Sequence, residues 1–360
     1  MSYAHKLSLA LIFLSLCPGL AYSQWFGSGE AEGGFSSGDA SATGGFGSGE
    51  VGTSIFGGSL FGGQQQTDVW GAPQGNNSPF ATSSFSNSFG DDCVSIWDEL
   101  TFFAGLDGSK QPQDFGVNAN LGAQFHVNWG IPVWQDYGVG LQIGTSLVAT
   151  ENALQMFDLL GEATTRTQSY TTIGMYQRTQ NGFAWGFVYD FLNETSYDTF
   201  SLGQWRLRAS YDWGPCDQFG ITVNISSFDD TGFVGGLIPV TLRPISQGTA
   251  YWRHYWETGA QTAFWIGLAE GHSEHNLVTG PAPNQDEVIV IGADILVPLN
   301  DYLAIYGETN LMMPANTGTV DAFLGIQWFP TGGAKQARRG GFAPLLPMAA
   351  PTSFSVDLQP

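Results

Sequence analysis

The sequence predicts an all-β protein: an up-and-down transmembrane β-barrel of about 12 antiparallel strands, preceded by a disordered N-terminal arm. Three observations lead to this prediction. Apolar and polar residues alternate with a period of two over much of the chain after residue 91. The segments between the alternating stretches are long and short in turn. The chain also begins with an export signal, and no later segment is apolar and long enough to form a spanning helix.

The first 23 residues have the pattern of a secretory signal peptide. Lys6 supplies the positive charge, residues 7–16 form the apolar stretch, and Ala21-Tyr22-Ser23 is a cleavage site with small residues at its two ends. No other apolar run approaches the ~18 residues that a spanning helix needs. An exported chain of this kind is predicted to be either a secreted protein or a membrane barrel.

Charge and composition narrow the class of protein further. The formal net charge is −21, from 32 acidic residues against 11 Lys and Arg, which argues against nucleic acid as a partner. Charged residues make up 12% of the chain, about half the ~25% of soluble domains. Aromatic residues make up 14%. Few charges and many rings favour a surface that lies partly in lipid.

Residues 24–90 differ in composition from the rest of the chain. They are rich in Gly and Ser, contain no Lys or Arg, and repeat the phrase GSGE at 27–30 and 47–50. Such a segment buries too little apolar area to offset the entropy of ordering it. We predict a disordered arm here. The barrel is then expected over residues 91–330, followed by a C-terminal tail over 331–360.

The strands are predicted from their alternation. In residues 116–130 the odd positions from Val117 to Trp129 are apolar, and the even positions are polar or Gly. The same period recurs in the third strand, where Leu141 and Ile143 alternate with Gln142 and Gly144. The twelve predicted strands are 98–106, 116–130, 137–149, 168–178, 182–192, 200–213, 218–228, 248–256, 260–268, 287–298, 301–312 and 318–329.

The connections between these strands indicate how the sheet is used. The long ones, 150–167, 229–247 and 269–286, all follow odd-numbered strands. Those after even-numbered strands, such as 179–181 and 257–259, are short turns. A meander with this asymmetry has its long loops at one end and its tight turns at the other, as outer-membrane barrels do.

The barrel prediction fixes which face of each strand is inside. The apolar face should point to lipid and the polar face should line the lumen. Tyr251, Trp252, Tyr255 and Trp256 are then expected to contribute to an aromatic girdle at the membrane surface. The alternative is a secreted β-sandwich, in which the same apolar faces would form a core.

Charged residues on the predicted inward faces are segregated by strand. Arg178, Arg206, Arg208 and Arg253 lie on the fourth, sixth and eighth strands, whereas Glu99, Asp294, Glu308 and Asp321 lie on the first, tenth, eleventh and twelfth. Basic and acidic walls would face one another across the lumen. Two interpretations remain open. The charges line a water-filled passage for small polar solutes, or they are salt-bridge partners that fill a closed interior.

Catalytic, metal and cofactor signals are weak. His272, Glu274 and His275 are metal-ligand types, but they fall in a long polar loop, where such clusters arise by chance. His126 and Ser146 on neighbouring strands are a conceivable hydrolase pair, but a wall-lining histidine is the plainer interpretation. We therefore predict no enzyme, no catalytic or metal residues and no cofactor.

Cys93 and Cys216 are the cysteines that remain after signal cleavage. In an oxidising compartment they are a candidate disulfide. Cys93 precedes the first strand and Cys216 lies in the turn after the sixth, across a twelve-strand ring. A bond between them would draw the N-terminal arm under or into the lumen, and the unpaired state is the alternative.

Four phrases resemble a family of exported, outer-membrane-barrel-like proteins of planctomycete-type bacteria. They are FFAGLDGSKQPQDFGVNANLG (102–122), WIGLAEGH (265–272), VPLNDYLAIYGETN (297–310) and GFAPLLPMA (341–349). The family has no assigned reaction, so the resemblance implies only location and architecture. The end of the chain departs from many bacterial barrels, which finish on an aromatic residue, because a tail follows Phe329 and ends in Leu358-Gln359-Pro360.

Taken together, these features predict an outer-membrane β-barrel that acts as a passive channel or a structural envelope protein. Outer-membrane lipid and small polar solutes are the expected partners. The alternative function is a secreted soluble β-protein that binds carbohydrate or another envelope component.

Overall fold

The computed structural model describes residues 95–359 apart from 112–118, 153–160, 162, 235, 272–273, 277–279, 283–286 and 314–318. The predicted signal peptide (1–23) and arm (24–90) lie outside the described residues. In the described part of the chain, no helix is long and apolar enough to cross a membrane.

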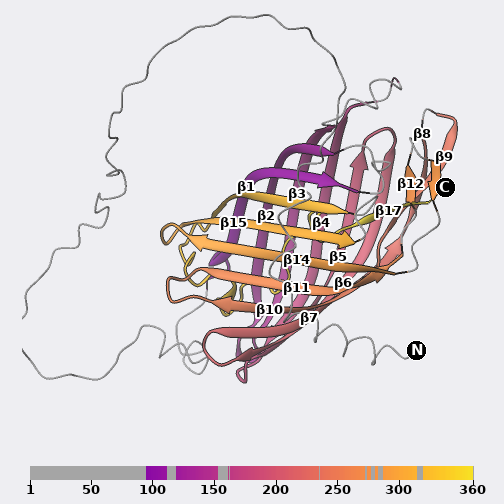
Figure 1. Ribbon diagram of the computed structural model, residues 1–360. Coiled ribbons are helices and arrows are strands. Elements are labelled where there is room, and N and C mark those ends of the chain that lie inside the picture. Colours follow the sequence, from indigo (N-terminus) through magenta and orange to yellow (C-terminus); the bar gives the residue numbers. More distant parts are fainter. Residues whose placement is uncertain are drawn as a thin grey trace, which may run out of the picture. The chain divides into compact units, whose positions relative to one another are not determined.

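Twelve antiparallel strands close into one barrel, as predicted (Figure 1). They are β1 (Glu99–Lys110), β2 (Asn120–Trp134), β3 (Val139–Asn152), β4 (Thr165–Arg178), β5 (Phe183–Thr195), β6 (Thr199–Trp213), β7 (Asp217–Phe228), β10 (Gln247–Tyr255), β11 (Gln261–Glu270), β14 (Glu287–Pro298), β15 (Leu303–Met313) and β16 (Val320–Trp328). Each strand pairs with the next of these twelve along the chain. The ring closes where β1 pairs with β16, from Phe102 opposite Trp328 to Lys110 opposite Val320.

The two faces of the barrel are the reverse of those of a soluble protein. On β2 the outward residues Leu121 and Phe125 are 63% and 57% exposed, whereas the alternating Gln124 and His126 are buried inside. Large apolar side chains are exposed in the same way on the other strands of the barrel. An apolar outer surface is stable only in lipid, and closure leaves no unpaired sheet edge there. The apolar faces do not form the core that the sandwich alternative requires. The chain is therefore a barrel of the outer-membrane type.

Of the four residues predicted for an aromatic girdle, two lie on the outside of the barrel and two do not. Trp252 and Trp256 are about half exposed on the outside, as expected. Tyr251 and Tyr255 are buried and point into the lumen. Residues one apart on a strand lie on opposite faces, so four closely spaced aromatics cannot all face the membrane.

The end of the barrel with the long connections, on the right in Figure 1, carries extra strands. β8 (Asp230–Val234) and β9 (Ile238–Pro244) form a hairpin within the predicted loop 229–247. β17 (Val356–Gln359), from the end of the chain, pairs with β9 to give a three-stranded sheet. A second small hairpin, β12 (Glu274–Asn276) and β13 (Gly280–Ala282), lies in the predicted loop 269–286.

The last thirty residues run lengthwise through the barrel. This C-terminal segment, residues 330–359, begins where β16 ends, among the short turns. Gly340 lies against Glu99 at the start of β1, and Ala349 bonds Thr172 near the middle of β4. Val356 then pairs with Pro244 of β9 at the end with the long connections. The predicted tail is thus inside the barrel, and most of its apolar side chains are buried there.

Replacing Ile143 by Arg is expected to destabilise the folded barrel by about 2–4 kcal/mol, the cost of a cation on the lipid face near mid-membrane. Ile143 lies near the middle of β3, is 39% exposed and points outward. The measurement is urea-induced unfolding in lipid vesicles. Ile143→Leu keeps the apolar surface and should be nearly neutral. Equal stability of the two variants would mean that this face does not contact lipid.

Candidate functional site in the barrel lumen

The charged residues predicted for the lumen lie on its wall. Arg178, Arg206, Arg208, Arg253, Asp294, Glu308 and Asp321 are at most 9% exposed. Glu99, at the start of β1, is partly buried beside Gly340 of the C-terminal segment. Strand alternation places these side chains inward, as it does the amides and hydroxyls that surround them.

Wall side chains donate hydrogen bonds to the backbone carbonyls of the C-terminal segment. Most of that segment has no regular secondary structure, so its carbonyls need outside donors once they are buried. The donors come from four strands, β3, β4, β6 and β7: Tyr176 to Phe342, Arg178 to Ala343 (3.0 Å), Arg208 to Leu345 (3.1 Å), Gln142 to Leu346 (2.8 Å), Arg206 to Pro347 (3.0 Å), and Gln204 (3.0 Å) and Asn224 (3.1 Å) to Ser353. Three predicted lumen arginines therefore bind protein backbone.

Two glycines let the C-terminal segment approach the wall closely. A Cβ atom on Gly130 of β2 would collide with the carbonyl of Phe342, and one on Gly144 of β3 would collide with the sulfur of Met348. Both glycines occupy inward positions of their strands. A larger residue at either position would displace the segment, which explains why glycine suits these places.

Two buried ion-pair groups join the wall charges to one another. Arg206 pairs with Asp190 of β5 in a two-point contact. Asp294 accepts from Arg253 at 2.7 Å and from Arg338 at 2.8 Å. Arg338 belongs to the short helix η4 (Ala337–Arg339) of the C-terminal segment. Arg338 also donates to the hydroxyl of Tyr306 at 2.7 Å.

These pairs differ from the predicted arrangement of a basic wall facing an acidic one. Arg253 contacts Asp294 directly, and Asp190 stands beside Arg206 on the basic side. Sequence reasoning missed Asp190, although it occupies an inward position opposite the aromatic face of β5. It also missed Arg338, because nothing in the periodicity of the tail indicates contact with the lumen.

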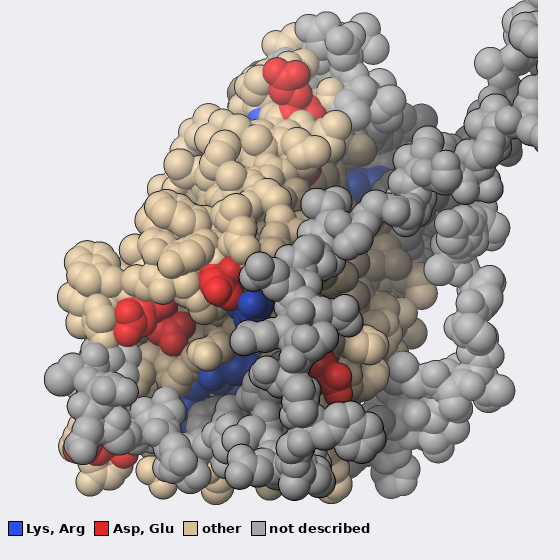
Figure 2. Space-filling model, turned by 90° about the vertical axis from the view of Figure 1, so that its left-hand side faces the viewer, with Lys and Arg blue, Asp and Glu red and all other residues tan. Residues whose placement is uncertain are grey.

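Figure 2 looks onto the end of the barrel that carries the short turns. Basic side chains gather near the middle of this face, and acidic side chains form separate patches around them. At this end Arg339 donates to the carbonyl of Pro215 in the turn between β6 and β7, and its guanidinium lies 4.2 Å from the ring centre of Tyr255. The C-terminal segment is thus held at its entry by charge and cation–π contacts.

Apolar clusters fill part of the interior towards both ends. Near the short turns, Phe103, Phe323 and Phe329 pack with Ala334 and Ala337. Near the long connections, the small sheet packs on the inner wall in a cluster of Val148, Tyr170, Leu192, Phe200, Leu202, Val234, Val240, Leu242, Met348, Ala349, Phe354, Val356 and Leu358. Such packing excludes water from the space that it fills.

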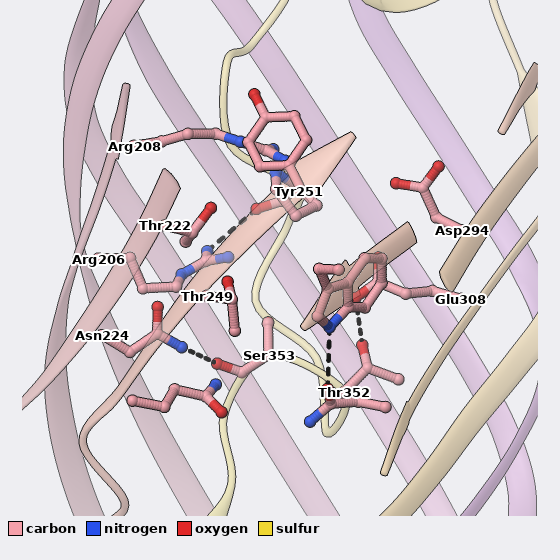
Figure 3. A pocket seen from close by; sticks show the side chains of 14 residues that line it. Arg206, Arg208, Thr222, Asn224, Thr249, Tyr251, Asp294, Glu308, Thr352 and Ser353 are labelled. Atoms are coloured by element: carbon pink, nitrogen blue, oxygen red, sulfur yellow. Dashed lines mark hydrogen bonds between the residues drawn. The ribbon is translucent and has the colours of Figure 1, made fainter. Parts of the chain in front are cut away.

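A pocket with a volume of about 60 Å³ lies beside the C-terminal segment. It lies between that segment and the wall formed by β6, β7, β10, β11, β14 and β15. Figure 3 shows Arg208 and Tyr251 on one side, with Asp294 and Glu308 on the other. Thr352 and Ser353 of the C-terminal segment close it from within and bond Glu308 and Asn224 respectively.

The residues considered as a hydrolase pair or as metal ligands lie as follows. His126 lies directly opposite Ser146 in the β2–β3 register, but the histidine stacks on Phe103 and its Nδ1 faces the amide of Gln124 at 3.3 Å. None of the described residues forms a hydrogen bond with the Ser146 hydroxyl. His272 and the side chains of Glu274 and His275 lie outside the described residues. Among those that are described, no group of three or more His, Cys, Asp or Glu side chains is arranged to hold a metal.

The structure describes only one of the two cysteines of the predicted disulfide. Cys216 lies in the turn between β6 and β7 and is partly buried. Cys93 lies outside the described residues, so the pairing stays a prediction.

Comparison with solved structures finds membrane barrels of low sequence identity. An outer-membrane channel of Pseudomonas putida F1 (COG4313) is 9% identical, with a TM-score of 0.47. The match covers 66% of this chain and 97% of the channel. Outer-membrane phospholipase A of Escherichia coli is 9% identical, with a TM-score of 0.37, and the match covers 68% of this chain and 97% of the phospholipase. The NanC porin is 10% identical, with a TM-score of 0.38, and the match covers 64% of this chain and 98% of the porin.

No curated protein matches the sequence. A family model does match it, over residues 99–356, which takes in the whole barrel and nearly all of the C-terminal segment. The chain belongs to DUF6666, a family of unknown function.

Proposed function

We propose that this protein is a closed outer-membrane barrel with a structural role in the envelope, and that it is not an open passive channel. The observation that carries the proposal is the C-terminal segment, which runs lengthwise through the lumen. Seven of its wall contacts are hydrogen bonds from Tyr, Arg, Gln or Asn side chains to its carbonyls. A buried carbonyl that loses its donor costs about 1–3 kcal/mol, so withdrawing the whole segment is unfavourable.

Planar-bilayer recording of the full-length protein tests this proposal. We expect no stable conductance steps from protein whose folding into the membrane has been verified by its β spectrum and by its shift in gel mobility on boiling. The reason is that the C-terminal segment occupies the lumen with polar contacts to the wall and apolar packing. Regular steps from the unmodified protein at modest voltage would contradict the proposal.

A second candidate function is the gated passage of small polar solutes. The observation that favours it is the pocket between the C-terminal segment and β7, β10 and β11, where the inward residues Thr222, Gln247 and Thr249 are partly exposed. Passage would require the segment to shift. Swelling of vesicles in a small polar solute, without conductance by ions, would favour this candidate over the structural one.

Location and chemistry complete the proposal. We infer that residues 1–23 direct export, that the mature chain resides in the outer membrane with lipid around it, and that it is not an enzyme. The resemblance to exported planctomycete-type proteins agrees with this location. The geometry of His126 and Ser146 supports the absence of hydrolase activity, because stacking and an amide contact occupy the imidazole. Esterase assays on the folded protein would test it.

A further inference from the structure

The floor of the luminal pocket is built from two rows of inward residues. Strand register places Arg208, Thr222 and Thr249 side by side on β6, β7 and β10. The next inward row holds Arg206, Asn224 and Gln247 on the same strands. Tyr251 and Trp265, which are opposite one another on β10 and β11, add an aromatic edge. The floor of the pocket is therefore made by strands of the barrel wall.

Two of the four charged residues that line the pocket are in direct ion pairs. Arg206 is paired with Asp190, and Asp294 is paired with Arg253 and Arg338. Two lining charges have no such partner in the described part of the chain. Arg208 bonds only the carbonyl of Leu345 and lies 4.2 Å from the ring centre of Tyr251. Glu308 accepts only from the hydroxyls of Tyr306 and Thr352, both at 2.8 Å.

The pocket thus has one cation on β6 and one anion on β15 that form no direct ion pair with a described residue, on opposite sides (Figure 3). The lining also keeps polar atoms without partners: Nε of Arg208, Oδ1 of Asn224, Oε1 of Gln247 and Nδ2 of Asn310. Buried polar atoms of this kind are normally satisfied by water or by a ligand. In a site of low dielectric constant, fixed charges act more strongly on a ligand than they do in water.

The size of the pocket limits what it can take. About 60 Å³ corresponds to roughly four or five water molecules, at 10–15 Å³ for each. A solute of about that many non-hydrogen atoms would fill it. Thr352 and Ser353, which the wall holds in place, border the pocket on the side of the C-terminal segment.

We propose that this pocket binds a small zwitterion of amino-acid type, with its carboxylate at Arg208 and its ammonium group at Glu308. A carboxylate matches the free donors of a guanidinium, and an ammonium group donates to the lone pairs that the hydroxyls leave on Glu308. The amides of Asn224, Gln247 and Asn310 supply neutral partners beside them. The proposal goes beyond the closed-barrel function and does not depend on whether ions are conducted.

Calorimetric titration of the full chain, folded in detergent micelles, tests the proposal with glycine as the probe. Acetate and methylammonium, which each carry one of the two charges, are the comparison ligands. Glycine is expected to bind at least about tenfold more tightly than either, because only glycine satisfies both charges. No heat of binding with glycine, or equal affinity for acetate, would overturn the proposal and leave the closed barrel untouched.

Variants locate the binding. Arg208→Gln and Glu308→Gln are each expected to weaken glycine binding about tenfold or more, the cost of one charge-assisted contact. Arg178→Gln is the matched control, because Arg178 also donates to a carbonyl of the C-terminal segment but does not line the pocket. Its affinity for glycine should stay within about twofold of that of the unmodified protein. An equal loss in the control would overturn the assignment.

Should Arg208→Gln not fold, Glu308→Gln decides alone, because glutamine keeps the size and an acceptor oxygen for the two hydroxyls. Unchanged glycine affinity in that variant would refute the role of the carboxylate.

Discussion

Removal of residues 335–360 is expected to convert the closed barrel into an ion-conducting one. The strand register that closes the barrel involves no residue beyond Trp328, so the twelve-strand wall should still form. The wall side chains that now bind the C-terminal segment would be hydrated instead, because they are polar and face a space wide enough for water. Planar-bilayer recording should then show stable conductance steps where the full-length protein shows none.

The control for this deletion is the state of the membrane-inserted protein. An unchanged β spectrum and a retained shift in gel mobility on boiling would show that the barrel is intact. A folded but silent deletion variant would mean that the loops and the inner wall close the lumen without the C-terminal segment. Our account of the closure would then be wrong.

Loss of Asp190 is the second large effect that we expect. Asp190 accepts from Thr172, Gln204 and Arg206, and Arg206 in turn holds the carbonyl of Pro347. Asp190→Leu removes the acceptor and leaves Arg206 as an unpaired buried cation. The expected loss in free energy of unfolding is about 3–5 kcal/mol, the usual cost of breaking a buried pair on one side.

A double-mutant cycle separates this loss from simple packing damage. Arg206→Met alone also breaks the pair, whereas Asp190→Leu with Arg206→Met removes both charges and should recover part of the loss. The measurement is urea-induced unfolding in lipid vesicles. Strictly additive losses would show that the two residues do not stabilise the barrel through their contact.

The sequence was sufficient to predict the barrel itself. Alternation is a local property of each strand, and it places Leu121 outward and Gln124 inward whatever the partner strands are. The order of the strands in the meander could be predicted from the asymmetry of the connections. Strands joined by a short turn are antiparallel neighbours, so contacts between distant residues are not needed to place them side by side. The inward position of Arg206 and of Asp294 had the same local origin.

What fills the lumen was decided only by the tertiary structure. Residues 330–355 carry no period of two or of 3.6, so nothing in that pattern predicts their conformation or location. Their carbonyls are satisfied by side chains such as Gln142 and Arg178, which lie 204 and 165 residues earlier in the chain than the carbonyls they bond. β17 likewise forms by pairing with β9, a strand of the distant loop 229–247.

The sequence likewise could not show what each charged side chain in the lumen binds, because that also depends on tertiary contacts. Arg208 and Arg253 are indistinguishable in their strand patterns, yet Arg253 has a carboxylate partner and Arg208 has only a carbonyl and a ring. Which neighbour an inward side chain meets depends on strand register, on the path of the C-terminal segment and on the tilt of the barrel. Local sequence determines which face a side chain occupies, and the packed interior determines what it binds there.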